Sequence, residues 1–417
     1  MKSEWREATL SEAVSLVIDH RGLTPKKLGG DWAEKGYRAL SAKNVKTGRI
    51  VQEDAIRFVS EQMYRRWMPD EIEKNDIIIT SEAPFGEILL WNTEEKIVLS
   101  QRLFGVRISR AFDPVFLYYY MLTDQFQGEM RARATGTTVI GLRQPELLKC
   151  RIRYPRIEDQ KKIASILRSF DDKIELNNRI NENLTEQIHT LCNAWLNDYI
   201  PFGGECPDDW ELTPLSSIAR FISGYSYKGN ELQESSVAMA TIKNFDRHGG
   251  FKLDGYKEIL PSSKLKPEHH VAMFDTLVAH TDLTQNAEVI GNAEPVLSFS
   301  GYGDIIFSMD VVKVLPNNPE ISKFLIAAML QTQQFKGHCL GYVNGTTVLH
   351  LSKKALPEYS LMLPKDFSVL KPLDEAVSSM YQQMAVNIDE NVQLAKLRDS
   401  LLPRLMSGEL DVSDLDL

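Results

Sequence analysis

Residues 136–155 read GTTVIGLRQPELLKCRIRYP, and residues 345–364 read GTTVLHLSKKALPEYSLMLP. The two stretches agree at seven of their twenty positions, including the opening Gly-Thr-Thr-Val and the closing proline. Their separation of about 200 residues is far longer than the roughly 20–50 residues of a solenoid repeat. The match therefore indicates a whole domain that the chain uses twice.

Further matches precede both stretches in the same order along the chain. They join FLYYYML (116–122) to FLIAAML (324–330), QFQG (125–128) to QFKG (334–337), Ser100 to Ser308, and Lys43-Asn44 to Lys243-Asn244. The two halves also begin alike, with EWREATLSE (4–12) and DWELTPLSS (209–217). The offsets stay between 199 and 209 residues, so we interpret the repeat as an internal duplication.

A long helix is predicted after each copy. Apolar residues follow Pro155 at alternating steps of four and three, and similar stepping begins near Pro372, which is typical of a coiled-coil seam. The seam residues that we expect to pair the helices are Ile163, Leu167, Phe170, Ile174, Asn177, Asn181, Leu184, Ile188, Val377, Tyr381, Met384, Ile388 and Asn391. Asparagines at such positions commonly fix register and partner. A helix of about 44 residues would span roughly 66 Å.

These patterns predict a mixed α/β (α+β) protein. We expect two globular domains from the duplication, each followed by a long helix, with the two helices pairing antiparallel as a coiled-coil spacer with pseudo-two-fold symmetry. The predicted boundaries are 1–155 for the first domain, 156–200 for the central helix, 201–371 for the second domain, and 372–417 for the C-terminal helix and tail. The alternative is that each seam packs against the chain's own globular core.

The composition and the motifs exclude several classes of function. A net charge of −9, 43% hydrophobic residues and 25% charged residues are those of an ordinary globular protein. The four cysteines lack metal-ligand spacing, and no Walker A loop, dinucleotide fingerprint, HExxH or GxSxG motif occurs. We therefore expect no catalytic residue, no metal ion and no cofactor in this chain. The lack of a signal core and of a long apolar run predicts a cytoplasmic protein.

The order of domain, long helix, domain, long helix resembles that of the specificity subunits of type I restriction–modification systems. The strings that carry the resemblance are PRIEDQKKIA (155–164), DDKIELNN (171–178) and the ending LLPRLMSGEL (401–410). The resemblance covers essentially the whole chain. One departure is that Lys365–Pro372 lacks a sequence like the EDQKKI (158–163) that begins the first long helix. The residue at which the second helix begins is therefore not determined by the resemblance.

The resemblance implies a DNA-binding, non-catalytic protein. Each globular domain would be a target-recognition domain that reads one half of a bipartite, asymmetric DNA site, and the helices would set the spacer. The implied partners are two methyltransferase (modification) subunits, which dock around the helices and methylate adenine N6, and restriction motor-nuclease subunits. S-adenosylmethionine, ATP and Mg²⁺ would then belong to those partners.

Candidate DNA contacts follow from residue types in the two domains. Lysine can pair with guanine and asparagine with adenine, while threonine hydroxyls and arginines suit phosphates. The candidates are Lys43, Asn44, Arg102, Arg131, Arg133, Thr137, Thr138, Arg143, Lys243, Asn244, Thr346 and Thr347. Fifteen of the 22 arginines lie in residues 1–155, so the first domain is better equipped for bidentate contacts to guanine. Ordinary turn residues or a solvated face remain the alternative for each candidate.

Two other functions remain open at this point. One is a recognition subunit of another methyltransferase or nuclease system with the same layout, and the other is a scaffold whose duplicated domains bind proteins. A specific DNA reader should lose affinity steeply as salt rises, whereas a scaffold has no such affinity to lose. The salt dependence of DNA binding therefore separates a reader from a scaffold.

Overall fold

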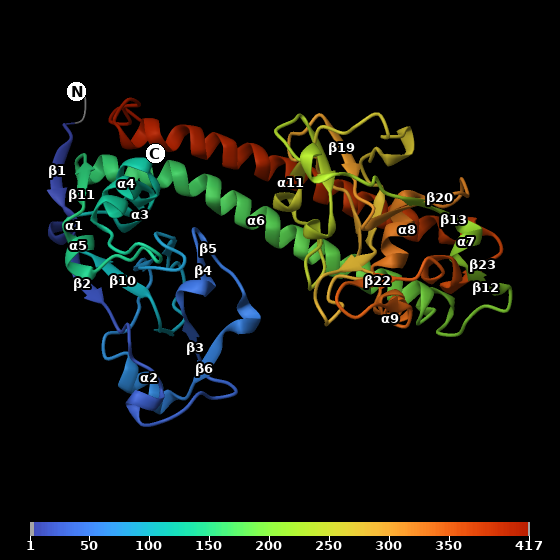
Figure 1. Ribbon diagram of the computed structural model, residues 1–417, viewed down its shortest axis with the longest axis horizontal. Helices are drawn as coiled ribbons and strands as arrows, with labels where there is room; N and C mark the ends of the chain where they lie inside the picture. The colour runs from blue at the N-terminus through green and yellow to red at the C-terminus, as the bar shows by residue number, and fades with distance from the viewer. Residues whose placement is uncertain (1–3, 416–417) are drawn as a thin grey trace. The chain divides into compact units, whose positions relative to one another are not determined.

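The computed structural model describes residues 4–415, which form two compact units. The first unit comprises the chain up to Asp172 and again from Leu394, and the second comprises Lys173–Gln393. Two long helices, α6 (Ile157–Leu196) and α11 (Lys371–Met406), each contribute residues to both units (Figure 1). Within the described range, no helix is long and apolar enough to cross a membrane.

The first unit is built on a four-stranded antiparallel sheet with the strand order β2-β10-β7-β8. A second sheet has the order β6-β3-β9, and β1 pairs with β11 at the join to α6. The strands are β1 (Arg6–Thr9), β2 (Val14–Ile18), β3 (Tyr37–Leu40), β4 (Val45–Lys46), β5 (Arg49–Ile50), β6 (Arg57–Val59), β7 (Ile77–Thr80), β8 (Ile88–Leu90), β9 (Ile97–Leu99), β10 (Leu103–Ile108) and β11 (Arg151–Tyr154). The shorter helices are α1 (Leu10–Ala13), α2 (Glu61–Trp67), α3 (Pro114–Leu122), α4 (Asp124–Arg133) and α5 (Gln144–Leu148).

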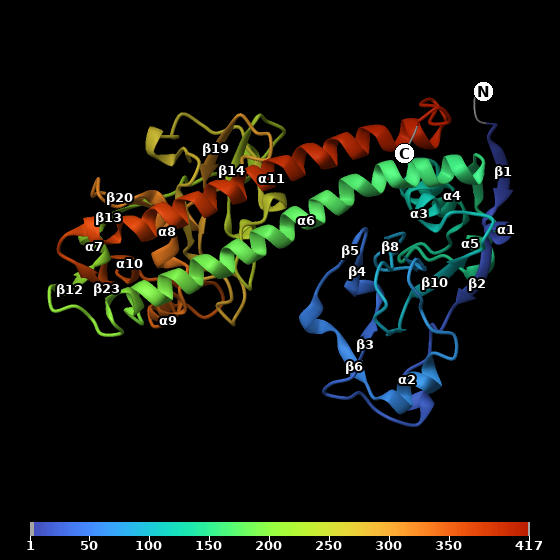
Figure 2. The ribbon, with the colours of Figure 1, turned by 180° about the vertical axis from the view of Figure 1, so that it is seen from behind.

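The second unit repeats these sheets. Its four-stranded sheet has the order β13-β20-β16-β18, its mixed sheet the order β15-β14-β19, and β12 pairs with β23 (Figure 2). The strands are β12 (Trp210–Pro214), β13 (Ala219–Ser223), β14 (Val237–Ala240), β15 (Lys257–Glu258), β16 (Thr276–Ala279), β17 (Thr281–Asp282), β18 (Ala293–Pro295), β19 (Asp304–Phe307), β20 (Val311–Pro316), β21 (Val343–Asn344), β22 (Leu349–Leu351) and β23 (Ser360–Pro364). The shorter helices are α7 (Leu215–Ile218), α8 (Lys323–Leu330), α9 (Gln333–Leu340) and α10 (Ala355–Glu358).

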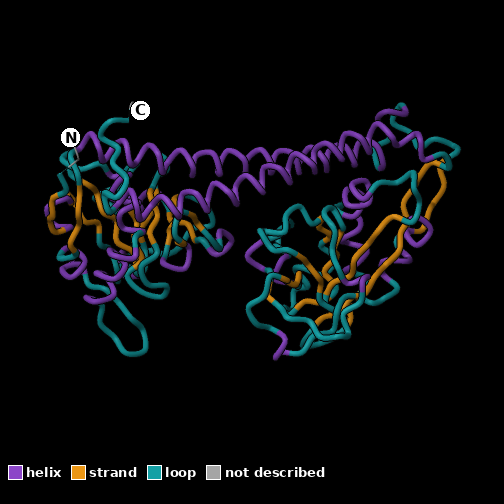
Figure 3. The backbone as a smooth tube through the Cα atoms, turned by 90° about the horizontal axis from the view of Figure 1, so that it is seen from above, coloured by secondary structure: helices purple, strands orange, loops and turns teal. Residues whose placement is uncertain are grey.

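The four-stranded sheet, the β6-β3-β9 sheet and the β1–β11 pair of the first unit each have a counterpart in the second, which confirms the predicted fold of two α/β units from a duplication. Strands β2, β10, β7 and β8 of the first unit take the places of β13, β20, β16 and β18 in the second. Figure 3 shows the strands gathered in the globular parts, with helix α6 or α11 alongside. Buried runs account for the central strands: every residue of Ile77–Thr80 and of Thr276–Ala279 is buried.

The QFQG and QFKG strings mark one capped helix in each unit. The hydroxyl of Thr123 accepts from the backbone N–H of Phe126 at the start of α4, and Thr332 accepts from Phe335 at the start of α9. Threonine stabilises a helix start because it satisfies an N–H that has no partner within the helix. Both phenylalanines are fully buried, so the match preserves a cap and a core contact together.

The outer parts of the seam lie in the globular cores rather than in a separate spacer. Ile163 and Leu167 of α6 belong to the core of the first unit, together with Leu405 of α11. In the second unit, Ile188 and Val377 belong to the core beneath the four-stranded sheet. The alternative that seam residues pack against the globular cores therefore holds for these residues, because helix ends that lie on a domain bury more apolar area there.

Candidate nucleic-acid interface

A backbone frame surrounds the Gly-Thr-Thr-Val turn of the first unit. The N–H of Ser81 donates to the carbonyl of Arg102 at 2.8 Å, and the N–H of Leu142 donates to the carbonyl of Ser81 at 3.0 Å. Thr135 and Gly141 exchange two backbone hydrogen bonds of 2.9 Å across the turn. We call these five residues the first turn frame. It joins three loops that are far apart in the sequence.

The second unit holds the same frame at corresponding positions. The N–H of His280 donates to the carbonyl of Asp310 at 2.9 Å, and the N–H of Leu351 donates to the carbonyl of His280 at 2.8 Å. Asn344 pairs with His350 across the turn, as Thr135 does with Gly141. We call these residues the second turn frame. The backbone is thus conserved between the units, while the side chains on it differ.

The shared glycine of the turn has a steric cause. Gly136 has φ +117° and Gly345 has φ +114°, a region that L side chains rarely adopt. A Cβ on Gly136 would lie 2.1 Å from the carbonyl oxygen of Val139, and one on Gly345 would lie 2.2 Å from that of Val348. Only glycine therefore fits this turn.

The predicted threonine contacts lie at the surface of both turns. Thr137, Thr138, Thr346 and Thr347 are exposed. None of their hydroxyls has a hydrogen bond to another residue in the described range 4–415, so they are free to bind phosphate oxygens.

Arg102 connects two hollows of the first unit. One hollow of about 220 Å³ is also lined by Lys43, and another of about 450 Å³ is also lined by Arg143 and Glu82. Lys43, Arg102 and Arg143 are all exposed. The structure therefore gathers three of the predicted cations beside the first turn frame, where they can face one ligand.

The predicted base contacts of Asn44 and Asn244 are not supported. Asn44 accepts from the N–H of Ser41 at 3.1 Å and donates to the carbonyl of Gln52 at 3.2 Å. Asn244 likewise accepts from Thr241 at 2.9 Å, and it donates to a carbonyl of its own loop. Both amides are buried, so their hydrogen-bonding groups are used inside the loop. Their role in the structure is to hold the adjacent lysine loops.

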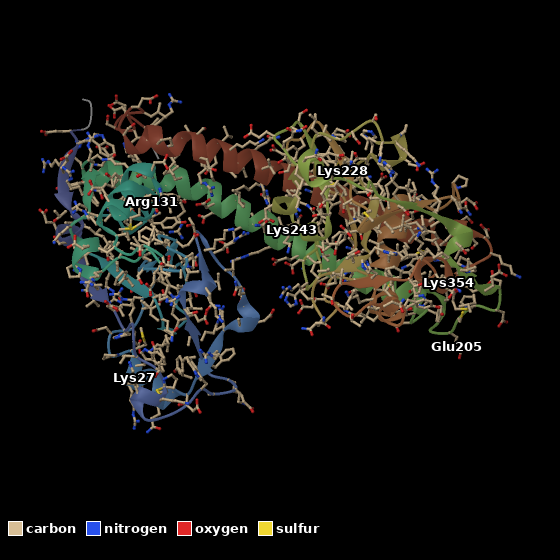
Figure 4. The ribbon with its side chains drawn as sticks, in the orientation of Figure 1. Lys27, Arg131, Glu205, Lys228, Lys243 and Lys354 are labelled. Atoms are coloured by element: carbon tan, nitrogen blue, oxygen red, sulfur yellow. The ribbon has the colours of Figure 1, made fainter. Side chains whose placement is uncertain are left out.

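Arg131 and Arg133 of α4 line neither hollow of the first unit. Arg133 pairs with Glu129 at 3.0 Å, and the same carboxylate accepts from Arg151. The predicted DNA role of Arg133 is not supported, because its side chain is only 27% exposed and lies away from the hollows that Arg102 lines. Arg131 is exposed on α4 (Figure 4), and in the described part of the chain it has no ion pair.

Lys243 in the second unit lies in a more mixed environment. It follows the buried strand β14 and is exposed (Figure 4). It lines a hollow of about 380 Å³ with Arg247 and Lys252, but Asp282 and Glu288 line the same hollow. Arg247 pairs with Glu288 at 3.0 Å. This hollow thus offers fewer free cations than the pair of hollows around Arg102.

Sequence reasoning missed the side chains that differ between the two turn frames. His280 is half-buried, and burial, then His350 and Lys353, lower its pKa, so the imidazole is neutral near pH 7. The ring of His350 lies 3.2 Å from the hydroxyl of Thr281. The sequence could have revealed this difference. When the repeats are aligned at offsets of 199 and 209 residues, His280 corresponds to Ser81 and His350 to Gly141.

Within the second unit, α6 and α11 pair antiparallel through a polar cluster. The Nδ2 of Asn177 donates to Oδ1 of Asn391 at 2.8 Å and to Glu390 at 2.7 Å. The Nδ2 of Asn387 donates to Oδ1 of Asn181 at 2.8 Å. Asn387 was missed by the heptad count, although its spacing of four from Asn391 matches that of Asn177 and Asn181.

The remaining seam residues are buried or half-buried. None of the thirteen predicted seam side chains is exposed. Those in the second unit are Ile174, Asn177, Asn181, Leu184, Ile188, Val377, Tyr381, Met384, Ile388 and Asn391, and those in the first are Ile163, Leu167 and Phe170.

The described residues offer no group of three or more His, Cys, Asp and Glu side chains suited to a metal ion. The exposed cations and threonine hydroxyls beside the first turn frame can instead bind a polyanion. Arginine and lysine neutralise phosphates, and arginine also reads guanine. The geometry therefore fits nucleic-acid recognition.

Comparisons with known proteins agree with this geometry. A family described as the type I restriction modification DNA specificity domain matches residues 2–186. The chain is 22% identical over 415 residues to the type I restriction enzyme MjaIX specificity subunit of Methanocaldococcus jannaschii, covering 94% of this chain and 87% of that protein. It is 21% identical to the MjaVIII specificity subunit of the same organism, covering 99% and 94%.

A solved structure shares the fold. It is the S subunit of a type I restriction-modification system from M. genitalium, which is 18% identical to this chain and superposes with a TM-score of 0.54. The match covers 97% of this chain and 96% of that one. The likeness supports the arrangement of sheets and long helices described above.

Proposed function

We propose that this chain, which resembles type I restriction enzyme specificity subunits over most of its length, binds a bipartite, asymmetric DNA site and reads one half-site with each unit. The observation that carries this proposal is the turn frame, which both units hold with the same backbone hydrogen bonds. The side chains around the two frames differ. One scaffold with two sets of side chains suits the reading of two different half-sites.

The proposed role is recognition without catalysis. Burial raises the pKa of the Cys150 thiol to about 11 and those of Cys192 and Cys339 to about 12, so these thiols stay protonated and unreactive. S-adenosylmethionine, ATP and Mg²⁺ are assigned to the partner subunits, and the complex works on host DNA in the cytoplasm.

The partners are two methyltransferase subunits and, for restriction, motor-nuclease subunits. Exposed apolar side chains on the helices support a docking role: Leu176 and Ile180 lie one turn apart on α6, and Val386 lies on α11. Leu176 is 52% exposed and Val386 is 62% exposed, so apolar side chains of both helices are accessible to a partner. In this proposal the helices also set the spacer between half-sites.

The test is the adenine methylation pattern of the host, determined by single-molecule sequencing with and without this gene. We expect methylation to disappear at one gapped, asymmetric motif when the gene is deleted. If no motif disappears, the gene is co-expressed with its methyltransferase subunits in a methylation-free host. A second result without any new motif would reject the proposal and favour a protein-binding scaffold.

A further inference from the structure

We propose that Arg102 and Asp310 occupy equivalent positions and determine one base in each half-site. Both residues supply the carbonyl that the turn frame uses, Arg102 for Ser81 and Asp310 for His280. The serine two residues before each one also makes the same contact, since Ser100 donates to Leu40 at 2.8 Å and Ser308 donates to Ala240 at 2.9 Å. These backbone hydrogen bonds thus place Arg102 and Asp310 at corresponding positions of the two frames, although only Arg102 of the two has a positive φ.

The guanidinium of Arg102 is held ready for a bidentate contact. Its Nε lies 3.0 Å from Oε1 of Glu82 in an ion pair at the surface, and its two terminal nitrogens make no hydrogen bond among residues 4–415. Arg102 also adopts φ +65°, an uncommon conformation for a residue other than glycine. Arginine presents two parallel donors to O6 and N7 of guanine, so Arg102 is assigned to a guanine in the half-site of the first unit.

The neighbours of these two residues change together between the units. In the first unit, a Cβ on Gly141 would lie 3.1 Å from Oε2 of Glu82, so the glycine leaves room for the carboxylate that orients Arg102. In the second unit, the equivalents of Glu82 and Gly141 are Thr281 and His350, which contact each other at 3.2 Å. The second unit therefore lacks both the arginine that corresponds to Arg102 and the carboxylate that corresponds to Glu82.

Asp310 is suited to the opposite kind of base edge. An ionised carboxylate only accepts hydrogen bonds, so it can pair with the amino group of cytosine or adenine and not with O6 or N7 of guanine. The half-buried carboxylate of Asp310 makes no hydrogen bond or ion pair among residues 4–415, and its charge raises the pKa of the neighbouring His280 imidazole, which partly offsets the lowering by burial. The preceding Met309 is exposed and can contact a thymine methyl group beside it.

This inference rests on the proposed function and is tested with the full chain co-expressed with its methyltransferase subunits. The complex selects duplexes from a library in which both half-sites are randomised. We expect Arg102→Ala to relax one guanine position in one half-site by roughly tenfold or more and to leave the other half-site unchanged. We expect Asp310→Ala to relax one cytosine or adenine position in the other half-site.

Two further variants separate base reading from charge and from misfolding. Arg102→Lys keeps the charge but loses the bidentate fork, so it should relax the same guanine position. Arg110→Ala removes an exposed cation of the first unit that lines neither hollow around Arg102, and it should change no position. Thermal unfolding of each complex shows whether a variant remains folded.

The outcomes distinguish the two claims. A wild-type complex that selects no bipartite motif overturns the proposed function, and this inference with it. A wild-type bipartite motif that persists unchanged in folded Arg102 and Asp310 variants overturns this inference alone. Two other results would also overturn it. One is that both variants lose base preference within the same half-site, and the other is that Arg102→Ala loses preference at a base other than guanine.

Discussion

The side-chain amide of Asn177 on α6 donates to Oδ1 of Asn391 on α11 across 2.8 Å, although Asn177 is 0% exposed. A buried amide without a partner costs roughly 1–3 kcal/mol, so the pairing of the helices is stabilised only in the register that joins these two residues. Asn181 and Asn387 meet in the same register, one turn away. The amide cluster therefore fixes how the two helices align within the second unit.

Replacing one member of the Asn177–Asn391 pair should be more damaging than replacing both. We expect Asn391→Leu to lower the free energy of unfolding by about 1–3 kcal/mol, because Asn177 keeps a buried amide with one partner fewer. The double variant with Asn177→Leu should recover much of that loss, since two apolar groups leave no amide unpaired. Urea unfolding checks both, with exposed Asn183→Leu as the control; a double variant less stable than the single one would contradict the argument.

The turn glycines should not tolerate a side chain. We expect Gly136→Ala and Gly345→Ala each to lower the free energy of unfolding by about 1–3 kcal/mol and to weaken DNA binding, because the added Cβ meets a carbonyl oxygen. The helix glycines Gly128 and Gly337 are matched controls at equivalent places, since a Cβ there meets nothing within 4 Å. Alanine at either control should stabilise the protein by about 0.5–1 kcal/mol in thermal unfolding. Equal effects at turn and helix glycines would contradict this explanation.

Glu294 should make stability depend on pH. Its carboxylate accepts from Gly250 at 2.6 Å and Gln331 at 2.7 Å, but burial raises its pKa from 4.5 to about 7. Between pH 4.5 and about 7 the carboxyl is therefore protonated in the folded state and ionised in the unfolded state. Its contribution to the free energy of unfolding is full below pH 4.5 and is lost as pH rises through about 7. We expect the free energy of unfolding of the wild type to fall by roughly 3 kcal/mol relative to that of Glu294→Gln between pH 4.5 and pH 8.

Urea unfolding at several pH values measures this difference. The exposed Glu205→Gln serves as a control, and it should track the wild type throughout. A Glu294→Gln protein with the same pH dependence as wild type would show that the buried carboxyl does not titrate in this window.

Arg143 and Arg133 should behave differently in DNA binding. Arg143 is exposed beside the first turn frame, and in the range 4–415 its side chain has no ion pair, so Arg143→Ala should reduce the slope of log Kd against log salt by about 0.9. Arg133→Ala should leave that slope unchanged, because its charge already pairs with Glu129. Binding of the methyltransferase complex to its own site at several salt concentrations decides between them; identical slopes for both variants would contradict the assignment.

The exposed apolar side chains on the helices should matter for assembly and not for folding. We expect the double variant Leu176→Gln, Ile180→Gln to reduce co-purification of the methyltransferase subunits, because it removes apolar area that the partner would bury. The free energy of unfolding should change by less than about 0.5 kcal/mol, as for other surface substitutions. Glu182→Gln, also exposed on α6, is the control. Undiminished co-purification would remove the support for docking at this place.

Some features of the candidate site were predictable and others were not. The repeat singled out Thr137 and Thr346 as candidate phosphate contacts, and the structure places both on exposed turns. It did not predict that Asn44 and Asn244 are buried, since a lysine–asparagine pair reads the same whether its amide faces solvent or caps a loop. The hydrogen bonds to Ser41 and Thr241 decide that point.

The sequence by itself determined the duplication, the two long helices and the Gly-Thr-Thr-Val string shared by the two turns. Each of these depends on the conformation of a few consecutive residues or on a periodic pattern, and local sterics and hydrogen bonding record such requirements directly in residue types. Only the tertiary structure decided that Arg102 lies beside Glu82 and lines one hollow with Lys43, that Asp310 corresponds to Arg102 in the second unit, and that Asn177 meets Asn391. These relationships join segments that are distant in the chain, and the packing of sheets and helices, which no local pattern encodes, brings those segments together.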